Sequence, residues 1–116
     1  MASTKAYLDF VLDQLDGLEG VRTRPMMGEY VLYCGEKVVG GIYDDRLLLK
    51  PTPAALRLMK EAGLDVQREL PYEGAKEMLL ADVDRRDLLR QTVQAIADEL
   101  PAPKKRPKET NRRKTG

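Results

Sequence analysis

The chain has 116 residues, with 20 Lys plus Arg, 19 Asp plus Glu and no His, which is the length of one ordinary domain. The lack of His excludes Ser-His-Asp and Cys-His catalytic sites and imidazole metal ligands. Cys34 is the only cysteine, which excludes an intrachain disulfide and a cysteine-based metal cluster and predicts a reducing compartment. We therefore expect a protein that is not an enzyme and that uses no cofactor and no metal.

The N-terminus, MASTKAYLDF, lacks the basic and then apolar pattern of a signal peptide. No apolar run approaches the ~20 residues that a membrane-spanning helix needs. The sequence therefore predicts a cytoplasmic protein that makes no membrane contact.

The charge is unevenly distributed along the chain. Residues 1–100 carry 13 basic and 18 acidic side chains, whereas residues 101–116 carry 7 basic side chains and only one acidic side chain, that of Glu109. This tail has no large apolar residue, so burial cannot offset the entropy lost on ordering it. We expect a folded domain over residues 1–101 and a disordered basic tail over residues 102–116. The cations of the tail are Lys104, Lys105, Arg106, Lys108, Arg112, Arg113 and Lys114.

Apolar spacing predicts a helix over residues 4–17, with Ser3 or Thr4 as its cap and Gly17 as its end. We expect its buried face to carry Tyr7, Phe10, Val11, Leu15 and Leu18. After Gly20 the pattern changes to short β-rich runs separated by turn residues, which is typical of a β-meander.

Two of these turns set an expected strand register. A type II′ turn at Gly35-Glu36 places Cys34 opposite Lys37, Tyr33 opposite Val38 and Val31 opposite Gly40. A turn at Asp44-Asp45 places Tyr43 opposite Arg46, Ile42 opposite Leu47 and Gly40 opposite Leu49. Because side chains alternate along a strand, one face of the sheet is then nearly pure core material. Its members are Val31, Tyr33, Val38, Gly40, Ile42, Leu47 and Leu49.

The opposite face would then combine an apolar centre with a charged rim, and a fully solvated face is normally more polar. We expect its apolar residues, Tyr30, Leu32, Val39 and Leu48, to be covered by a partner, most simply a second copy of the chain in a homodimer. The alternative is that C-terminal segments of the same chain cover this face.

The second half of the chain predicts two helices and one strand. Thr52, Pro53 and Gly63 are the cap, first residue and stop of a helix, and Asp84 caps another that runs to Leu100. Between them we expect a loop over residues 64–76, held by Leu70 and Tyr72, and a short strand over residues 77–81. The order α-β-β-β-β-α-β-α predicts a two-layer α+β fold with an antiparallel sheet.

Few side chains indicate chemistry. Asp44 with Asp45, and Asp82 with Asp84, are explained by a hairpin tip and a helix cap, although paired carboxylates are also used in acid-base catalysis and cation binding. Cys34 has no cationic cluster near it in the sequence and is interpreted as a small hydrophobic residue.

The segment Arg24-Pro25-Met26-Met27-Gly28-Glu29-Tyr30 has the most unusual composition in the chain. Two interpretations apply. The adjacent methionines suit an adaptable binding surface. Alternatively, one methionine belongs to the core and Gly28 forms a β-bulge.

This segment, together with Gly35-Glu36-Lys37-Val38-Val39-Gly40-Gly41-Ile42 and Asp44-Asp45-Arg46-Leu47-Leu48-Leu49-Lys50-Pro51, resembles the TfoX (Sxy) N-terminal domain family. The likeness extends over about residues 3–101 and, residue by residue, covers the motif Arg24, Met26, Met27, Gly28 and Tyr30. It implies a two-layer α+β architecture similar to that of secretion chaperones. It also implies a non-enzymatic role, because family members include transcriptional co-activators of natural competence and DNA transformation.

Two functional hypotheses follow. In the first, the chain is a regulator whose body binds a transcription factor or dimerises, while the tail contacts DNA phosphates without sequence specificity. In the second, the chain is a homodimeric protein-interaction module with no DNA role, and the tail only keeps it in solution.

Overall fold

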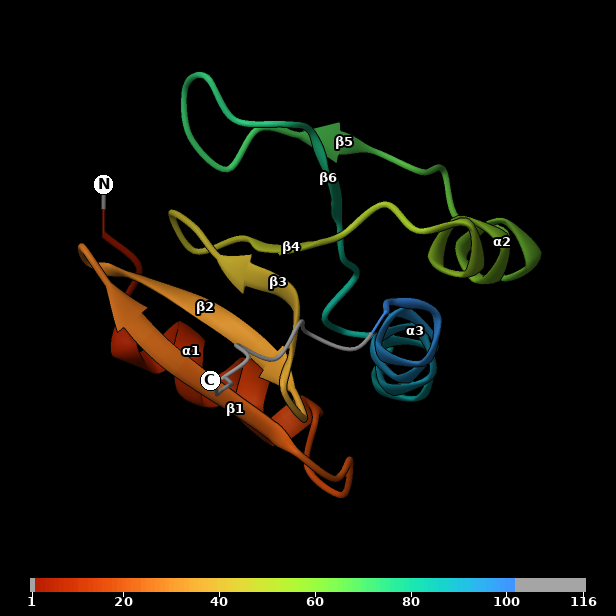
Figure 1. The fold of residues 1–116 in the computed structure, drawn as a ribbon, viewed down its shortest axis with the longest axis horizontal. Helices are drawn as coiled ribbons and strands as arrows, with labels where there is room; N and C mark the ends of the chain where they lie inside the picture. Colours follow the sequence, from red (N-terminus) through yellow and green to blue (C-terminus); the bar gives the residue numbers. More distant parts are fainter. Residues whose placement is uncertain (1, 102–116) are drawn as a thin grey trace, which may run out of the picture.

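The computed structural model describes residues 2–101, which form one six-stranded antiparallel sheet and three helices (Figure 1). The predicted α+β fold class is confirmed. The basic segment 102–116, with the seven cations named above, lies outside the described residues. The helices are α1 (Lys5–Gln14), α2 (Pro53–Glu61) and α3 (Arg86–Glu99). The strands are β1 (Val21–Met26), β2 (Glu29–Cys34), β3 (Lys37–Ile42), β4 (Leu47–Leu49), β5 (Arg68–Glu69) and β6 (Met78–Leu80).

The strand order across the sheet is β1-β2-β3-β4-β6-β5. The first four strands form the predicted meander, and β6 adds to β4 as the short strand expected near residues 77–81. The two-residue strand β5 was not predicted, because Arg68 and Glu69 lie in a segment rich in charged residues and turn formers. Its pairing with Leu79 and Met78 therefore comes from tertiary structure rather than from local preference.

Two of the three helices begin as predicted. The Thr4 hydroxyl accepts a hydrogen bond from the Tyr7 amide, and Thr52 caps α2 in the same way. The expected cap of α3 is wrong, because the Asp84 amide instead donates to the Asp82 carboxylate in a local turn, and α3 begins at Arg86 without a side-chain cap. None of the helices within residues 2–101 is long and apolar enough to cross a membrane.

Tight turns join the first four strands. Gly35 has a φ of +67° in the β2–β3 turn, as expected for a type II′ turn. In the other two turns both central residues have positive φ, which is typical of type I′ turns: +53° and +85° at Met27 and Gly28, and +53° and +55° at Asp44 and Asp45. Gly28 therefore forms a hairpin turn between β1 and β2 and not the β-bulge considered from the sequence.

A bulge in β3 changes the expected register. The pairs next to the β2–β3 turn, such as Tyr33 with Val38, are as predicted. Val39 is then an extra residue, so Leu32 pairs with Gly40 and Val31 pairs with Gly41. The predicted pairing of Val31 with Gly40 is therefore wrong, whereas the predicted β3–β4 register is confirmed.

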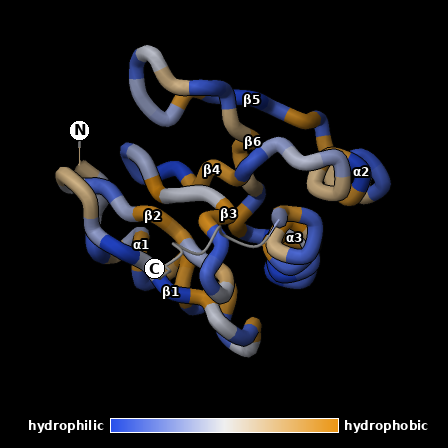
Figure 2. Tube along the Cα trace, in the orientation of Figure 1, coloured by the Kyte–Doolittle hydropathy of each residue, from blue (hydrophilic) through white to orange (hydrophobic). Residues whose placement is uncertain are grey.

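Because of this bulge, each side chain of β2 lies on the face of the sheet opposite to the predicted one. Leu32, Cys34 and Val39 are buried in the core beneath the helices, together with Ile42, Leu47 and Leu49. The prediction that these residues form an exposed partner face is wrong. Leu32, Val39 and Leu48 are each 0% exposed within one chain, and the half-buried Tyr30 packs against the core. Figure 2 shows the hydrophobic character concentrated on the central strands, with hydrophilic segments toward the outside.

The three helices pack on one face of the sheet and are joined by polar contacts at their ends. Figure 1 shows α1 behind β1 and β2, with α2 and α3 side by side. The Glu99 carboxylate accepts a hydrogen bond from the Ala54 amide at the start of α2, and the Arg85 guanidinium donates to the Ala62 carbonyl at its end. These contacts satisfy backbone groups that a helix leaves unpaired at its termini. The other face of the sheet carries no helix from the described part of the chain, residues 2–101.

Candidate binding groove

The sheet face opposite the helices, here called the open face, carries apolar residues at its centre. Val31, Tyr33 and Val38 are half-buried there. The Arg22 guanidinium lies 4.2 Å from the centre of the Tyr33 ring, a cation–π contact between β1 and β2. Leu48 also alternates to this face, where it pairs with Gly41 and Leu80, and it is fully buried.

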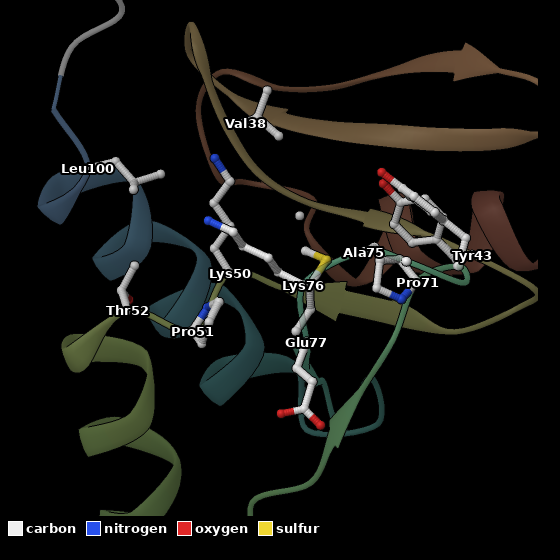
Figure 3. Close-up of a pocket in the computed structure, with 14 residues that line it drawn as sticks. Val38, Tyr43, Lys50, Pro51, Thr52, Pro71, Ala75, Lys76, Glu77 and Leu100 are labelled. Carbon is white, nitrogen blue, oxygen red and sulfur yellow. The ribbon is translucent and has the colours of Figure 1, made fainter.

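A loop over residues 70–77 borders the open face and divides it into two adjacent cavities. The first, the lysine cavity, has a volume of about 690 Å³ (Figure 3). Its walls are mostly apolar, and two lysines, Lys50 and Lys76, reach into it. Its lining residues include Val38, Lys50, Pro51, Pro71, Lys76, Met78 and Leu100.

The second cavity, the methionine cavity, has a volume of about 620 Å³ and lies at the tip of the β1–β2 hairpin. Met26 and Met27 line it, and they are 49% and 99% exposed. Neither methionine belongs to the core, so the core interpretation of this motif is wrong. Unbranched thioether side chains at an exposed tip can adapt to partners of different shape.

Tyr43 and Tyr72 line both cavities and form the ridge between them. Their ring centres are 6.2 Å apart, with the rings tilted by 59°. A Cβ atom at Gly41 would lie 2.6 Å from the Tyr43 ring, so the ring rests on the sheet only because residue 41 has no side chain. Burial, followed by the proximity of Tyr72 and Glu29, raises the pKa of the Tyr43 hydroxyl, which stays neutral.

Arg46 holds the loop in place over the open face. Its guanidinium forms an ion pair with Glu69 of β5 and donates a hydrogen bond to the Leu70 carbonyl at 3.3 Å. The same group donates to the Tyr43 carbonyl at 3.1 Å. Since Arg46 directly follows the β3–β4 turn, these contacts connect the turn, β5 and the start of the loop.

The tips of the two type I′ hairpins are held together by the N-terminal residues. Glu29 accepts hydrogen bonds from the amides of Ser3 and Asp44, each at 3.0 Å. The Asp45 carboxylate accepts from the Thr4 amide at 2.8 Å, and the Asp45 amide donates to the Ser3 hydroxyl at 3.1 Å. The Asp45 carboxylate and the backbone amide of Asp44 therefore have a structural role at the hairpin tip.

Residues 2–101 contain no group of three or more His, Cys, Asp or Glu side chains that could hold a metal ion. Cys34 is 7% exposed, and its thiol lies 3.7 Å from the Glu19 carbonyl. Burial raises the pKa of this thiol, so the reactive thiolate is disfavoured in the folded state. The interpretation of Cys34 as a small hydrophobic residue agrees with this environment.

The structure separates the residues of the predicted motif. Met26 and Met27 line the methionine cavity, and Gly28 forms the adjoining turn, but Arg24 and Tyr30 line neither cavity. Sequence reasoning missed Lys50, Lys76 and Met78, since they come together only when the loop over residues 70–77 lies against the open face. Tyr72 could have been found, because it is a single aromatic residue in an otherwise polar loop and was expected to hold it.

Comparison with known proteins agrees with this fold. A protein of Spirochaeta aurantia, described as an uncharacterized 12.7 kDa protein in the trpE 5′ region, is 39% identical over 112 residues. The match covers 95% of this chain and 94% of that relative. The family model for the TfoX N-terminal domain matches residues 13–96, a span that includes the hairpin tip, the ridge and both lysines of the groove. The chain therefore belongs to the TfoX N-terminal domain family.

Proposed function

We propose that the chain is a non-enzymatic regulator of the competence type, which acts by binding a protein partner in the groove that the lysine cavity and the methionine cavity together form on its open face. The two cavities on the helix-free face carry this proposal, because they join apolar walls, exposed thioethers and a tyrosine ridge into one concave surface. Exposed apolar surface of this kind is typical of interaction sites. The TfoX N-terminal domain family is not a known enzyme family, and it suggests a competence-related regulatory role.

The partner in this proposal is a transcription factor of the genes for DNA uptake, and the groove contacts one exposed segment of it. The exposed residues that offer the largest contact area are Met27 and Tyr72, which are 99% and 62% exposed. Large flexible and aromatic side chains supply much of the binding energy in protein interfaces. Contacts at both positions would span the two cavities, since Tyr72 lines both and Met27 lies at the outer end of the second.

A genetic experiment tests this role. In the host organism, deletion of the gene should lower the transcripts of DNA-uptake genes and the transformation frequency, and the wild-type gene should restore both. Tyr72→Ala should restore them poorly, because it removes half of the ridge. Phe10→Ala is the matched control, since Phe10 is also aromatic but lies on α1, on the other side of the sheet. The sequence placed Phe10 on the buried face of its helix, which is wrong, because its side chain is 41% exposed. Unchanged transcripts in the deletion strain would overturn the proposal.

A second contribution is proposed for the tail, supported by its seven basic residues and single acidic residue. It contacts DNA phosphates without sequence specificity and keeps the regulator near its genes. Anisotropy of a labelled DNA duplex should then rise with the full chain and not with residues 1–101, and the affinity should fall steeply with salt. Equal binding by both forms would contradict this contribution, and no binding by either would favour a protein-interaction module without a DNA role.

A further inference from the structure

Two cations line the lysine cavity, and neither has an anionic partner among residues 2–101. Lys50 follows β4, and Lys76 precedes β6 on the loop that borders the cavity. Within residues 2–101 neither ammonium group forms an ion pair or a hydrogen bond, whereas Lys5 and Lys37 find partners. Figure 3 shows both side chains directed toward the same end of the cavity, near Val38 and Leu100, and the Glu77 carboxylate directed away from them.

The surroundings of the two lysines are apolar. Val38, Pro51, Met78 and Leu100 contribute aliphatic, ring and thioether groups to the walls. Lys50 is half-buried and Lys76 is exposed, and two like charges directed toward the same end of this space repel each other. An anionic group placed between them would lower this electrostatic energy, and apolar groups attached to it would lose contact with water.

We propose that the lysine cavity binds an extended segment of the partner protein in which large apolar side chains flank an aspartate or glutamate, whose carboxylate lies between Lys50 and Lys76. This inference rests on the proposed function and specifies the chemistry of its partner. The carboxylate fixes the position of the segment along the groove, since the ammonium groups point toward one end of the cavity. The flanking apolar side chains occupy the walls formed by the prolines and Met78.

Two other occupants fit the charges less well. The chain's own segment 102–116 follows closely after Leu100, but it carries seven cations and would be repelled by the two lysines. A nucleic acid strand would meet a domain in which residues 1–100 carry 18 acidic against 13 basic side chains. Of the apolar groups that line the lysine cavity, only Tyr43 and Tyr72 are aromatic, and they pair with each other at 6.2 Å between ring centres. Single-stranded nucleic acids are instead bound by series of aromatic rings that stack on successive bases.

Selection from a random peptide library displayed on phage tests the inference with the full chain as the target. The selected peptides should share an acidic residue between large apolar residues. A fluorescein-labelled selected peptide is then titrated by anisotropy, beside the same peptide with glutamine or asparagine in place of its acidic residue. The neutral peptide should bind about five-fold or more weakly, as expected for loss of a partly buried charge pair.

Matched variants locate the site of binding. Lys50→Gln and Lys76→Gln should each weaken the acidic peptide about five-fold and leave the neutral peptide nearly unaffected, because each removes one charge that only the carboxylate uses. Lys60→Gln is the control, since Lys60 is exposed on α2 and lines neither cavity. Circular dichroism verifies that all three variants are folded.

The outcomes separate this inference from the proposed function. If the selected peptides are neutral or basic, the carboxylate inference is wrong. It is also wrong if Tyr72→Ala weakens their binding but neither lysine variant does, and in that case the groove still binds peptides. If the library yields no peptide that is sensitive to Tyr72→Ala or to either lysine variant, both are wrong. If a labelled single-stranded oligothymidine binds through Lys50 and Lys76 more tightly than any selected peptide, the cavity is a nucleic-acid site and the inference is likewise overturned.

Discussion

The Glu29 carboxylate, at the start of β2, accepts a hydrogen bond from the backbone amide of Asp44, in the turn that joins β3 to β4. The other oxygen of Glu29 accepts from the Ser3 amide and hydroxyl. One side chain therefore connects the N-terminal segment to the tips of two hairpins, beside the methionine cavity. Glu29 lies between Gly28 and Tyr30 of the motif, and its contacts explain why a carboxylate follows the turn glycine.

Replacing Glu29 with alanine should lower the free energy of unfolding by about 1–2 kcal/mol, because charge-assisted hydrogen bonds at a partly exposed site are lost. Urea denaturation followed by circular dichroism measures this change. The control is Glu36→Ala, in the exposed β2–β3 turn, where no side-chain hydrogen bond is made within residues 2–101. Equal midpoints for the two variants would show that the contacts of Glu29 do not stabilise the fold.

Replacing Met27 with asparagine should raise stability by about 0.5–1 kcal/mol, because asparagine accepts positive φ more readily than methionine does. Met27 has a φ of +53° and is 99% exposed, so its side chain contributes almost no burial to the folded state. The same variant should bind groove peptides more weakly. Met26→Gln, which has no positive φ, should leave stability nearly unchanged; a fall in the stability of Met27→Asn would contradict this explanation.

Replacing Gly40 with alanine should lower stability by roughly 3 kcal/mol or more, since the clash is with main chain that cannot rotate away. A Cβ atom there would lie 2.1 Å from the Leu48 carbonyl oxygen and 3.0 Å from the Leu49 Cα. Gly35→Ala is the comparison: a Cβ at Gly35 meets nothing within 4 Å, so its cost is limited to the backbone strain at a φ of +67°, about 1–3 kcal/mol. Thermal unfolding should rank the two in this order, and the reverse order would contradict the packing seen at Gly40.

Replacing Leu32 with aspartate should prevent folding rather than change an assembly state. Leu32 is 0% exposed beneath the helices, and an unpaired carboxylate in that position costs several kcal/mol, about the full stability of a small domain. A homodimer of the chain stays a prediction, and light scattering of the wild-type protein measures it. If the Leu32→Asp protein folds and its mass in solution differs from that of the wild type, the prediction that Leu32 lies in a partner interface would be supported again.

Stability should decrease as the pH rises through the ordinary range of a thiol, and part of this decrease should come from Cys34. Burial raises the pKa of the Cys34 thiol, so above the ordinary thiol range the unfolded chain loses a proton that the folded chain retains. Unfolding is then favoured by rising pH. Denaturant titrations at about pH 8 and pH 10, around the usual thiol pKa near 8.5, should show a smaller decrease for Cys34→Ala than for the wild type. Equal decreases would overturn this assignment.

Local sequence patterns predicted most of the elements and the turn positions. Thr4 and Thr52 identified two helix starts, and Asp44-Asp45 gave the right register for β3 and β4. The start of α3 was misplaced because Asp84 makes its local contact with Asp82 and not with the helix. Cap residues and turn residues use the same side-chain chemistry, so spacing alone cannot distinguish them.

The groove could be predicted only in part. The unusual composition around Met27 correctly indicated the outer end of the groove. The assignment of side chains to the two faces of the sheet failed at Val39, because a bulge has no clear signature in a run of β-branched residues and glycines. Lys50 and Lys76 are 26 positions apart in the sequence and meet only through the tertiary placement of the loop. Contacts between segments so distant are not encoded in local propensity.

The extra residue in β3 also has a consequence for how this surface can change during evolution. Side chains alternate between the two faces of a strand, so inserting or deleting one residue near Val39 exchanges what β3 presents to the core and to the groove. Val38 would turn toward the helices, and apolar core residues would turn toward solvent. Substitutions can therefore change the binding specificity of the groove in small steps, whereas selection should remove single-residue insertions and deletions in this strand. In β3, the number of residues is constrained as tightly as their identity.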